Sequence, residues 1–138
     1  MASLIYNSNV DDMARGAIDL DTDTFKVMLV TSAYAPNKDT DLKRSAVTNE
    51  VSGTGYTAGG VTSACTVTKS TANDRVTLGF AAVTWASSTI TARGAVIYKS
   101  RGGASSADEL VCYIDFVSDV SSTASTFSLG SSTITLQN

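Results

Sequence analysis

Apolar and polar side chains alternate along much of this chain, and this period of two limits its possible folds more than any other feature. Such a period places one set of side chains on one face of a β-sheet. It is strictest in two runs, 63–69 and 75–80, which are joined by the turn-forming residues 70–74. The alternating apolar residues of these runs are Cys65, Val67, Val76, Leu78 and Phe80. The pattern predicts a β-hairpin.

Further strands are expected on both sides of this hairpin. Residues 24–31 predict a long strand, paired through a turn at 21–23 with a short strand at 17–20. Continuous apolar runs within 89–100 and 110–117 predict two central strands that are covered on both faces.

The last strands are expected near the end of the chain. Residues 126–129 and 133–136 flank Gly130 and predict a terminal hairpin. The side chains expected to face inward there are Phe127, Leu129, Ile134 and Leu136. The only segment with helical character is Thr40 to Val47, which is short for a helix.

These elements predict an all-β fold, an antiparallel β-sandwich or jelly roll of about seven or eight strands with at most one short helix. The chain has 138 residues, the usual size of one domain. We expect a single β-sandwich domain at 14–138, preceded by an N-terminal arm at 1–13 that docks on a neighbouring subunit. The arm carries the apolar residues Leu4, Ile5 and Tyr6. The alternative is that this segment packs on its own subunit.

Charge and hydropathy exclude several classes of partner. The net charge is −3 and the basic residues are scattered, whereas nucleic-acid binding requires clustered lysine and arginine. No apolar run approaches the length that spans a bilayer, and the first residues lack the features of a signal peptide. We therefore expect neither nucleic acid nor membrane as a partner.

The two cysteines, Cys65 and Cys112, lie within alternating apolar sequence and are expected to be free, buried thiols, with a disulfide as the alternative. Without a histidine they cannot complete a tetrahedral zinc site. The absence of histidine also excludes the Ser-His-Asp and Cys-His types of nucleophilic catalysis. Only two glutamates, Glu50 and Glu109, accompany the aspartates, and nothing places a carboxylate pair around a sugar. We expect no enzymatic activity and no cofactor.

Two motifs resemble ligand sites but are better explained as turns. Asp19, Asp21 and Asp23 begin like a calcium loop, but the glycine and glutamate required later in that loop are missing, so a hairpin turn is favoured over a metal. The glycines at 53, 55, 59 and 60 match no phosphate-binding pattern. We expect them to form backbone turns around Tyr56.

Four blocks of sequence carry a family resemblance, and their order and spacing make it specific. They are DTDTFKVMLVTSAY at 21–34, VSGTGYTAGGV at 51–61, TWASSTITARGAVIYK at 84–99 and YIDFVSDVSST at 113–123. Together they resemble small β-rich virion structural proteins of tailed bacteriophages, most closely the capsid decoration, or cement, proteins.

The resemblance implies a jelly-roll subunit that forms a homotrimer and binds the outside of the major capsid protein lattice. There it would stabilise the mature head on the capsid surface, after synthesis in the host cytoplasm. The family has no catalytic motif that could be transferred. Two alternatives remain open: a structural or receptor-binding module of the tail, neck or fibre, and a host-encoded sandwich that binds carbohydrate or protein.

Candidate interface residues follow from residue type, because aromatic and arginine side chains are enriched in interface cores. Besides the residues of the arm they are Tyr34, Tyr56, Trp85 and Arg93. For Trp85 and Tyr56 burial inside one subunit is the alternative, and for Trp85 stacking on a carbohydrate is another.

Overall fold

The structure is a computed structural model that describes residues 2–138. In this part of the chain eight strands form two antiparallel sheets, so the prediction of an all-β sandwich with one short helix is confirmed. The elements follow in the order β1 (Leu4–Ile5), α1 (Asn7–Ala14), β2 (Phe25–Val30), the 3-10 turn η1 (Arg44–Ala46), β3 (Val61–Ser63), β4 (Cys65–Ser70), β5 (Arg75–Phe80), β6 (Val83–Lys99), β7 (Leu110–Leu129) and β8 (Ser132–Gln137). No helix among these elements is both long and apolar enough to cross a membrane.

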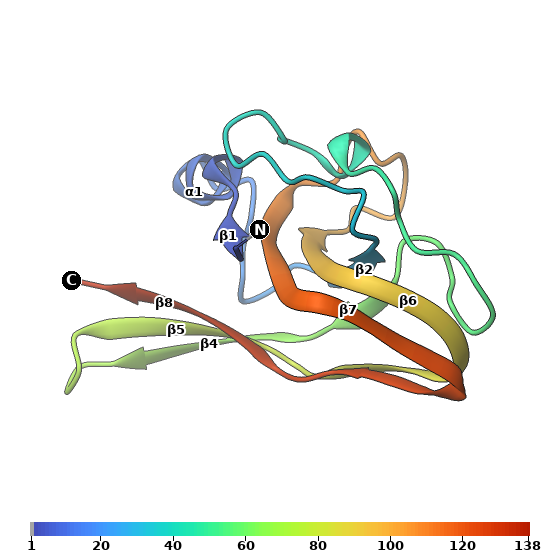
Figure 1. The fold of residues 1–138 in the computed structure, drawn as a ribbon. Helices are drawn as coiled ribbons and strands as arrows, with labels where there is room; N and C mark the ends of the chain where they lie inside the picture. Colours follow the sequence, from blue (N-terminus) through green and yellow to red (C-terminus); the bar gives the residue numbers. More distant parts are fainter. Residues whose placement is uncertain (1) are drawn as a thin grey trace.

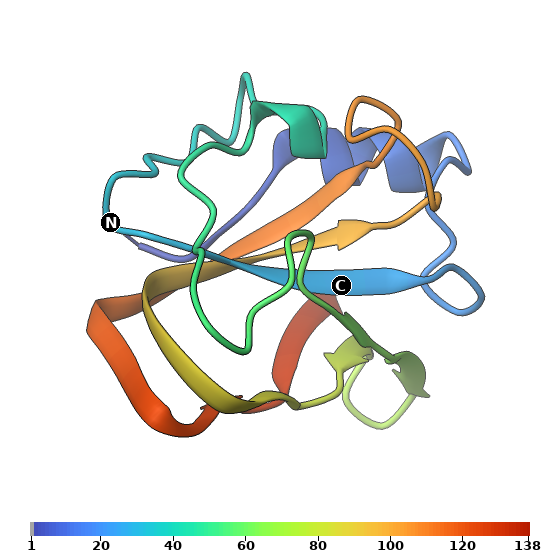
Figure 2. The same ribbon diagram turned by 90° about the vertical axis from the view of Figure 1, so that its right-hand side faces the viewer.

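One sheet has five strands in the order β1-β7-β6-β2-β3, and the other has three in the order β4-β5-β8. The three-stranded sheet lies beneath the five-stranded one in Figure 1. Figure 2 shows α1 and the segment 31–47 on the opposite face of the five-stranded sheet. That sheet is therefore the central layer, which explains why the apolar runs 95–98 and 110–113 are buried on both faces as predicted.

The long strands β6 and β7 bend together through a corner and return toward the three-stranded sheet (Figure 1). Their register shifts between Trp85 and Ser88 and again between Ser88 and Ile90. Ser87 and Ala124 have positive φ angles of 50° and 46° at this corner. β-Bulges bend a strand and raise its twist, which allows one strand to serve both layers.

A larger bulge interrupts β7 further toward its start. Ala92 pairs with Val120 but Gly94 pairs with Asp115, so the four residues 116–119 stand opposite Arg93 alone. Val117 lies within this bulge at a φ of 71° and is 78% exposed. A β-branched residue seldom adopts this left-handed conformation.

Two apolar clusters fill the layers. The main core lies between the sheets and contains Phe25 and Phe80, whose rings meet edge to face at 5.6 Å. The second core lies on the outer face of the five-stranded sheet and is rich in tyrosine; its ring pairs include Tyr34 and Tyr113 at 6.0 Å.

The hairpin predicted from 63–69 and 75–80 is confirmed, since β4 and β5 pair from Cys65–Phe80 to Ser70–Arg75. The hairpin predicted at 17–31 is wrong, because 17–20 is not a strand. The N–H of Asp19 donates to the carboxylate of Asp23, and the N–H of Asp21 donates to the carboxylate of Asp19. These local bonds replace the backbone pairing that a strand would need.

The terminal hairpin is also wrong. Residues 126–129 belong to β7 and pair with β6, whereas 133–136 belong to β8 and pair with β5. The chain passes from one sheet to the other at Gly130 and Ser131. Phe127 and Ile134 face inward as expected, but Leu136 is 44% exposed.

The helical segment predicted over Thr40–Val47 contains only the short turn η1, and the α-helix lies instead in the predicted arm. In α1, Asp11 forms an ion pair with Arg15 at 2.8 Å. Asn9 is buried, and Met13 packs against the main core. Before the helix, Leu4 and Ile5 pair with Tyr113 and Cys112 of β7. The N-terminal segment thus packs on its own chain, as in the alternative, and its docking on a neighbouring subunit stays a prediction.

Candidate interaction surface

Two of the aromatic residues predicted to form an interface lie in the second core. Tyr6 is fully buried and Tyr34 nearly so, and their hydroxyls lie 2.9 Å apart. The Tyr34 hydroxyl donates to the Asp41 carboxylate at 2.8 Å, so Tyr6 donates to Tyr34. Burial raises the pKa of both tyrosines far above the usual range. This chain of hydrogen bonds holds the N-terminal segment against the loop that follows β2.

Two more of the predicted aromatics lie against the main core. Trp85 is only 3% exposed and packs on the Tyr56 ring, with ring centres 6.1 Å apart. The Tyr56 hydroxyl accepts from the N–H of Leu29 and donates to the Glu50 carboxylate at 2.7 Å. Trp85 therefore lies in the interior of one subunit, with no open ring face for a carbohydrate, whereas Tyr56 is only half-buried.

The remaining predicted residues lie nearer the surface. The Arg93 guanidinium donates to the Asp115 carboxylate at 3.1 Å and its side chain is 28% exposed. Leu4 is partly buried against the second core, and Ile5 is 40% exposed. Of the seven residues, these three and the half-buried Tyr56 retain exposed surface, whereas Tyr6, Tyr34 and Trp85 are buried.

Leu4 and Ile5 border an apolar groove of about 430 Å³ between β1 and β8. Its other walls come from β5, β7 and β8. They are formed by Phe80, Cys112, Tyr113, Ile114, Ser132, Thr133, Ile134 and Thr135, with Ser3 at the end. The groove is lined by residues of the predicted arm together with strands whose proximity to the arm was not predicted from the sequence. The inward positions of Phe80 and Ile134 followed from alternation, but the opening between them and β1 depends on the sheet order.

The two motifs that resemble ligand sites form turns, which are held by hydrogen bonds and an ion pair within the chain. No cluster of three potential metal ligands occurs among residues 2–138. The Asp23 carboxylate instead pairs with the Lys99 ammonium at 2.7 Å. In the glycine-rich loop, the N–H of Gly59 donates to the Glu50 carboxylate at 2.6 Å. The glycines form turns around Tyr56, as predicted.

Two buried acids, Asp108 and Glu109, are held by basic side chains. Asp108 accepts from Arg44 at 2.8 Å, and Glu109 accepts from Arg101 at 2.6 Å and lies 3.3 Å from Lys43. Burial would raise the pKa of Glu109, but the hydrogen bond from Arg101 and the charge of Lys43 outweigh it and hold this pKa below its usual range. This cluster of Lys43, Arg44, Arg101, Asp108 and Glu109, here called the ion cluster, anchors the connection between β6 and β7.

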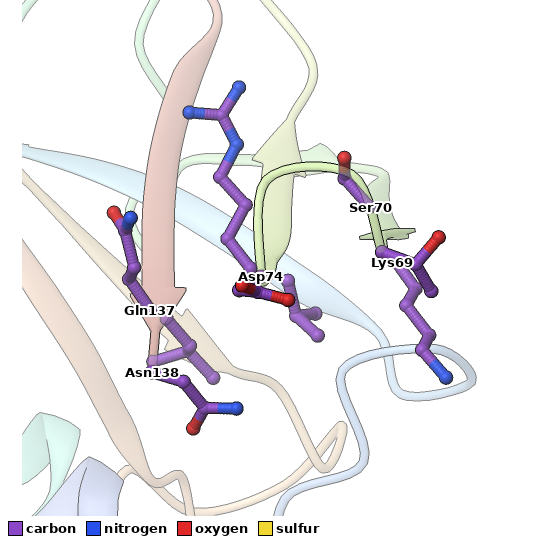
Figure 3. Close-up of a pocket in the computed structure, with 9 residues that line it drawn as sticks. Lys69, Ser70, Asp74, Gln137 and Asn138 are labelled. Carbon is purple, nitrogen blue, oxygen red and sulfur yellow. The ribbon is translucent and has the colours of Figure 1, made fainter.

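Two further hollows are more polar. Figure 3 shows one of about 290 Å³ at the tip of the three-stranded sheet, beside the turn between β4 and β5, where Lys69, Asp74 and Gln137 project. The other, of about 490 Å³, lies at the β6–β7 corner and is lined mainly by Thr, Ser and the Glu50 carboxylate.

Both cysteines are free, as predicted. Cys112 is buried, and this burial raises the pKa of its thiol to about 12. A thiol held in its protonated form is a weak nucleophile, so Cys112 contributes packing to the groove and no chemistry.

Comparisons of the sequence with protein-family models and curated proteins, and of the structure with solved structures, found no match.

Proposed function

We propose that this protein is a virion structural protein of a tailed bacteriophage, a capsid decoration subunit that binds the outside of the major capsid protein lattice. The observation that carries the proposal is the ordered set of four sequence blocks that resemble such proteins. In the fold these blocks supply β2, the Tyr56 loop, β6 and most of the first half of β7. They are therefore the framework of the five-stranded sheet.

The chemistry of the surface supports a binding role. Serine and threonine are the commonest residue types, and only 17% of residues are charged. A hydroxyl-rich face can hydrogen-bond to a neighbouring protein without the large cost of burying unpaired charge. Aromatic residues that could stack on a glycan are not gathered on the surface, because Tyr6, Tyr34, Tyr98, Tyr113 and Trp85 are buried.

The mechanism is one of mass action. A subunit that binds only the assembled, expanded lattice stabilises that lattice in proportion to the logarithm of its concentration over its Kd. As a homotrimer at a local three-fold axis, it would bridge adjacent major capsid proteins and resist their separation. No catalytic step is required.

The test is to mix the purified protein with decoration-free shells before and after expansion. Co-sedimentation with expanded shells alone, a higher melting temperature of those shells, and trimeric knobs between capsomers in cryo-electron microscopy are expected. Density in the neck, tail or fibre of virions would favour the alternative module. Absence from the particle would overturn both assignments.

A further inference from the structure

β8 is an edge strand whose outer side is free to pair. Successive residues of an antiparallel strand point their backbone groups to opposite sides. Asn138 donates its N–H to the carbonyl of Asp74, so the even-numbered residues of β8 face β5. The N–H and C=O groups of Thr133, Thr135 and Gln137 consequently point away from the sheet.

This edge lacks the usual protection against another strand. The six residues Ser132–Gln137 contain no charge, no proline and no bulge, and they pair with β5 without a break. Proteins commonly protect edges with charged residues, with prolines or with very short strands. Here β4 carries Lys69, while β1 and β3 have only two and three residues.

The groove lies directly beside the same edge. The three-stranded sheet ends at β8, so among residues 2–138 no strand covers the apolar underside of β1 and β7 formed by Ile5, Cys112 and Ile114. β1 lies above β8 in Figure 1. A strand added to β8 would gain hydrogen bonds on one side and place every second side chain in the groove.

We propose that the free edge of β8 binds one extended segment of another protein chain, with apolar side chains at alternate positions. The free backbone groups select an extended chain, and the apolar, uncharged walls select apolar side chains. β1 lies across the groove from β8, so a strand added to β8 would also lie beside Ile5. This inference is independent of the proposed function.

A tethered strand tests the site without knowledge of the partner. Asn138 directly follows β8, so a glycine added after it completes an Asn-Gly turn, which favours a two-residue hairpin. Five further residues, Thr-Val-Thr-Val-Thr, would then run back along β8. The threonines would stand opposite Gln137, Thr135 and Thr133, and the valines opposite Leu136 and Ile134 would enter the groove.

The extended protein should melt several degrees higher than the parent, and the amides of Thr133 and Thr135 should exchange more slowly by NMR. The matched control replaces the three added threonines with proline, which removes the N–H groups that would face β8. Equal melting temperatures and exchange rates for the two extensions would overturn the proposal.

In a second variant, the proline that prevents strand pairing is placed in β8 rather than in the extension. Thr135→Pro removes an outward N–H but no bond to β5, and proline is tolerated at such edge positions. It should abolish the gain given by the threonine-valine extension. A gain that survives in Thr135→Pro would show that apolar contact alone holds the segment and would overturn strand addition. If this variant does not fold, the proline-bearing extension still decides.

Discussion

Gly60 shows how one residue fixes a loop against a strand. Its backbone is left-handed, with a φ of 74°, and an added β-carbon would overlap the carbonyl of Val27. The neighbouring Gly59 carbonyl accepts a hydrogen bond from the Tyr98 hydroxyl at 2.6 Å. The Tyr56 loop can thus lie close against β2 only because residue 60 lacks a side chain.

Gly60→Ala should lower the free energy of unfolding by roughly 2 to 4 kcal/mol, since it adds both a steric overlap and an unfavourable φ. Urea unfolding of the two proteins measures the difference. Gly103→Ala is the control, because Gly103 is exposed and a β-carbon there would meet nothing within 4 Å. Equal losses for the two variants would contradict the role assigned to Gly60.

The aromatic residues mark the limit of prediction at this scale. An aromatic side chain is expected to be buried, but residue type alone does not distinguish a subunit interface from the core of one subunit. Tyr6 and Tyr34 lie 28 positions apart and are joined through their hydroxyls and Asp41, a contact that no local pattern encodes. Alternation, by contrast, correctly predicted that Leu78 and Phe80 face inward.

At the scale of elements, strands were predictable and their partners were not. Period two identified β4, β5 and β8, and continuous apolar runs identified parts of β6 and β7, because both patterns depend on local burial alone. Pairing depends on where the chain turns, and nothing local shows that Gly130 and Ser131 join two sheets. Helix α1 contains few strong helix formers, and the packing of Met13 against the main core supports it.

The bulge in β7 gives a prediction of its own. Val117→Gly should raise the free energy of unfolding by about 1 kcal/mol, because glycine adopts the left-handed backbone without strain and the exposed side chain contributes little burial. Denaturant unfolding measures this change. Val120→Gly, at a paired position of the same strand, should instead destabilise by a similar amount. A loss of stability at Val117 would show that its side chain has a structural role.

At the scale of the whole molecule, the ion cluster ties the β6–β7 connection to η1 through Arg44 and Asp108. The Arg44 guanidinium also lies over the Tyr98 ring, 5.0 Å from its centre. Asp108 and Glu109 are only 1% and 3% exposed, so these pairs are screened weakly by solvent. They link the second core to the end of the central sheet at which β6 and β7 are connected.

This arrangement predicts a loss of stability in acid. The folded-state pKa of Glu109 is lowered, so its stabilisation is present above the pKa of the unfolded chain, about 4.3, and is lost as the pH falls through the folded-state value. Glu109→Gln should cost roughly 1 to 2 kcal/mol at pH 7, because Arg101 and Lys43 lose a buried anionic partner but remain partly exposed to water. The cost should shrink on acidification.

Urea unfolding at pH 7 and at pH 3 measures this change. The exposed Asp119 serves as the control, and Asp119→Asn should show little effect at either pH. A pH-independent cost of Glu109→Gln would assign the effect to packing rather than charge.

The ion cluster has a further consequence for how this chain can be modified. Arg101 and Glu109 clamp the two ends of a loop whose residues 102–104 are exposed, and it lies far from the β1–β8 groove in Figure 1. Loop closure becomes only slowly more costly as residues are added. Because of this clamp, changes in the loop sequence should have little effect on the stability of the sandwich. The loop is therefore the natural site for inserting a foreign peptide into the protein.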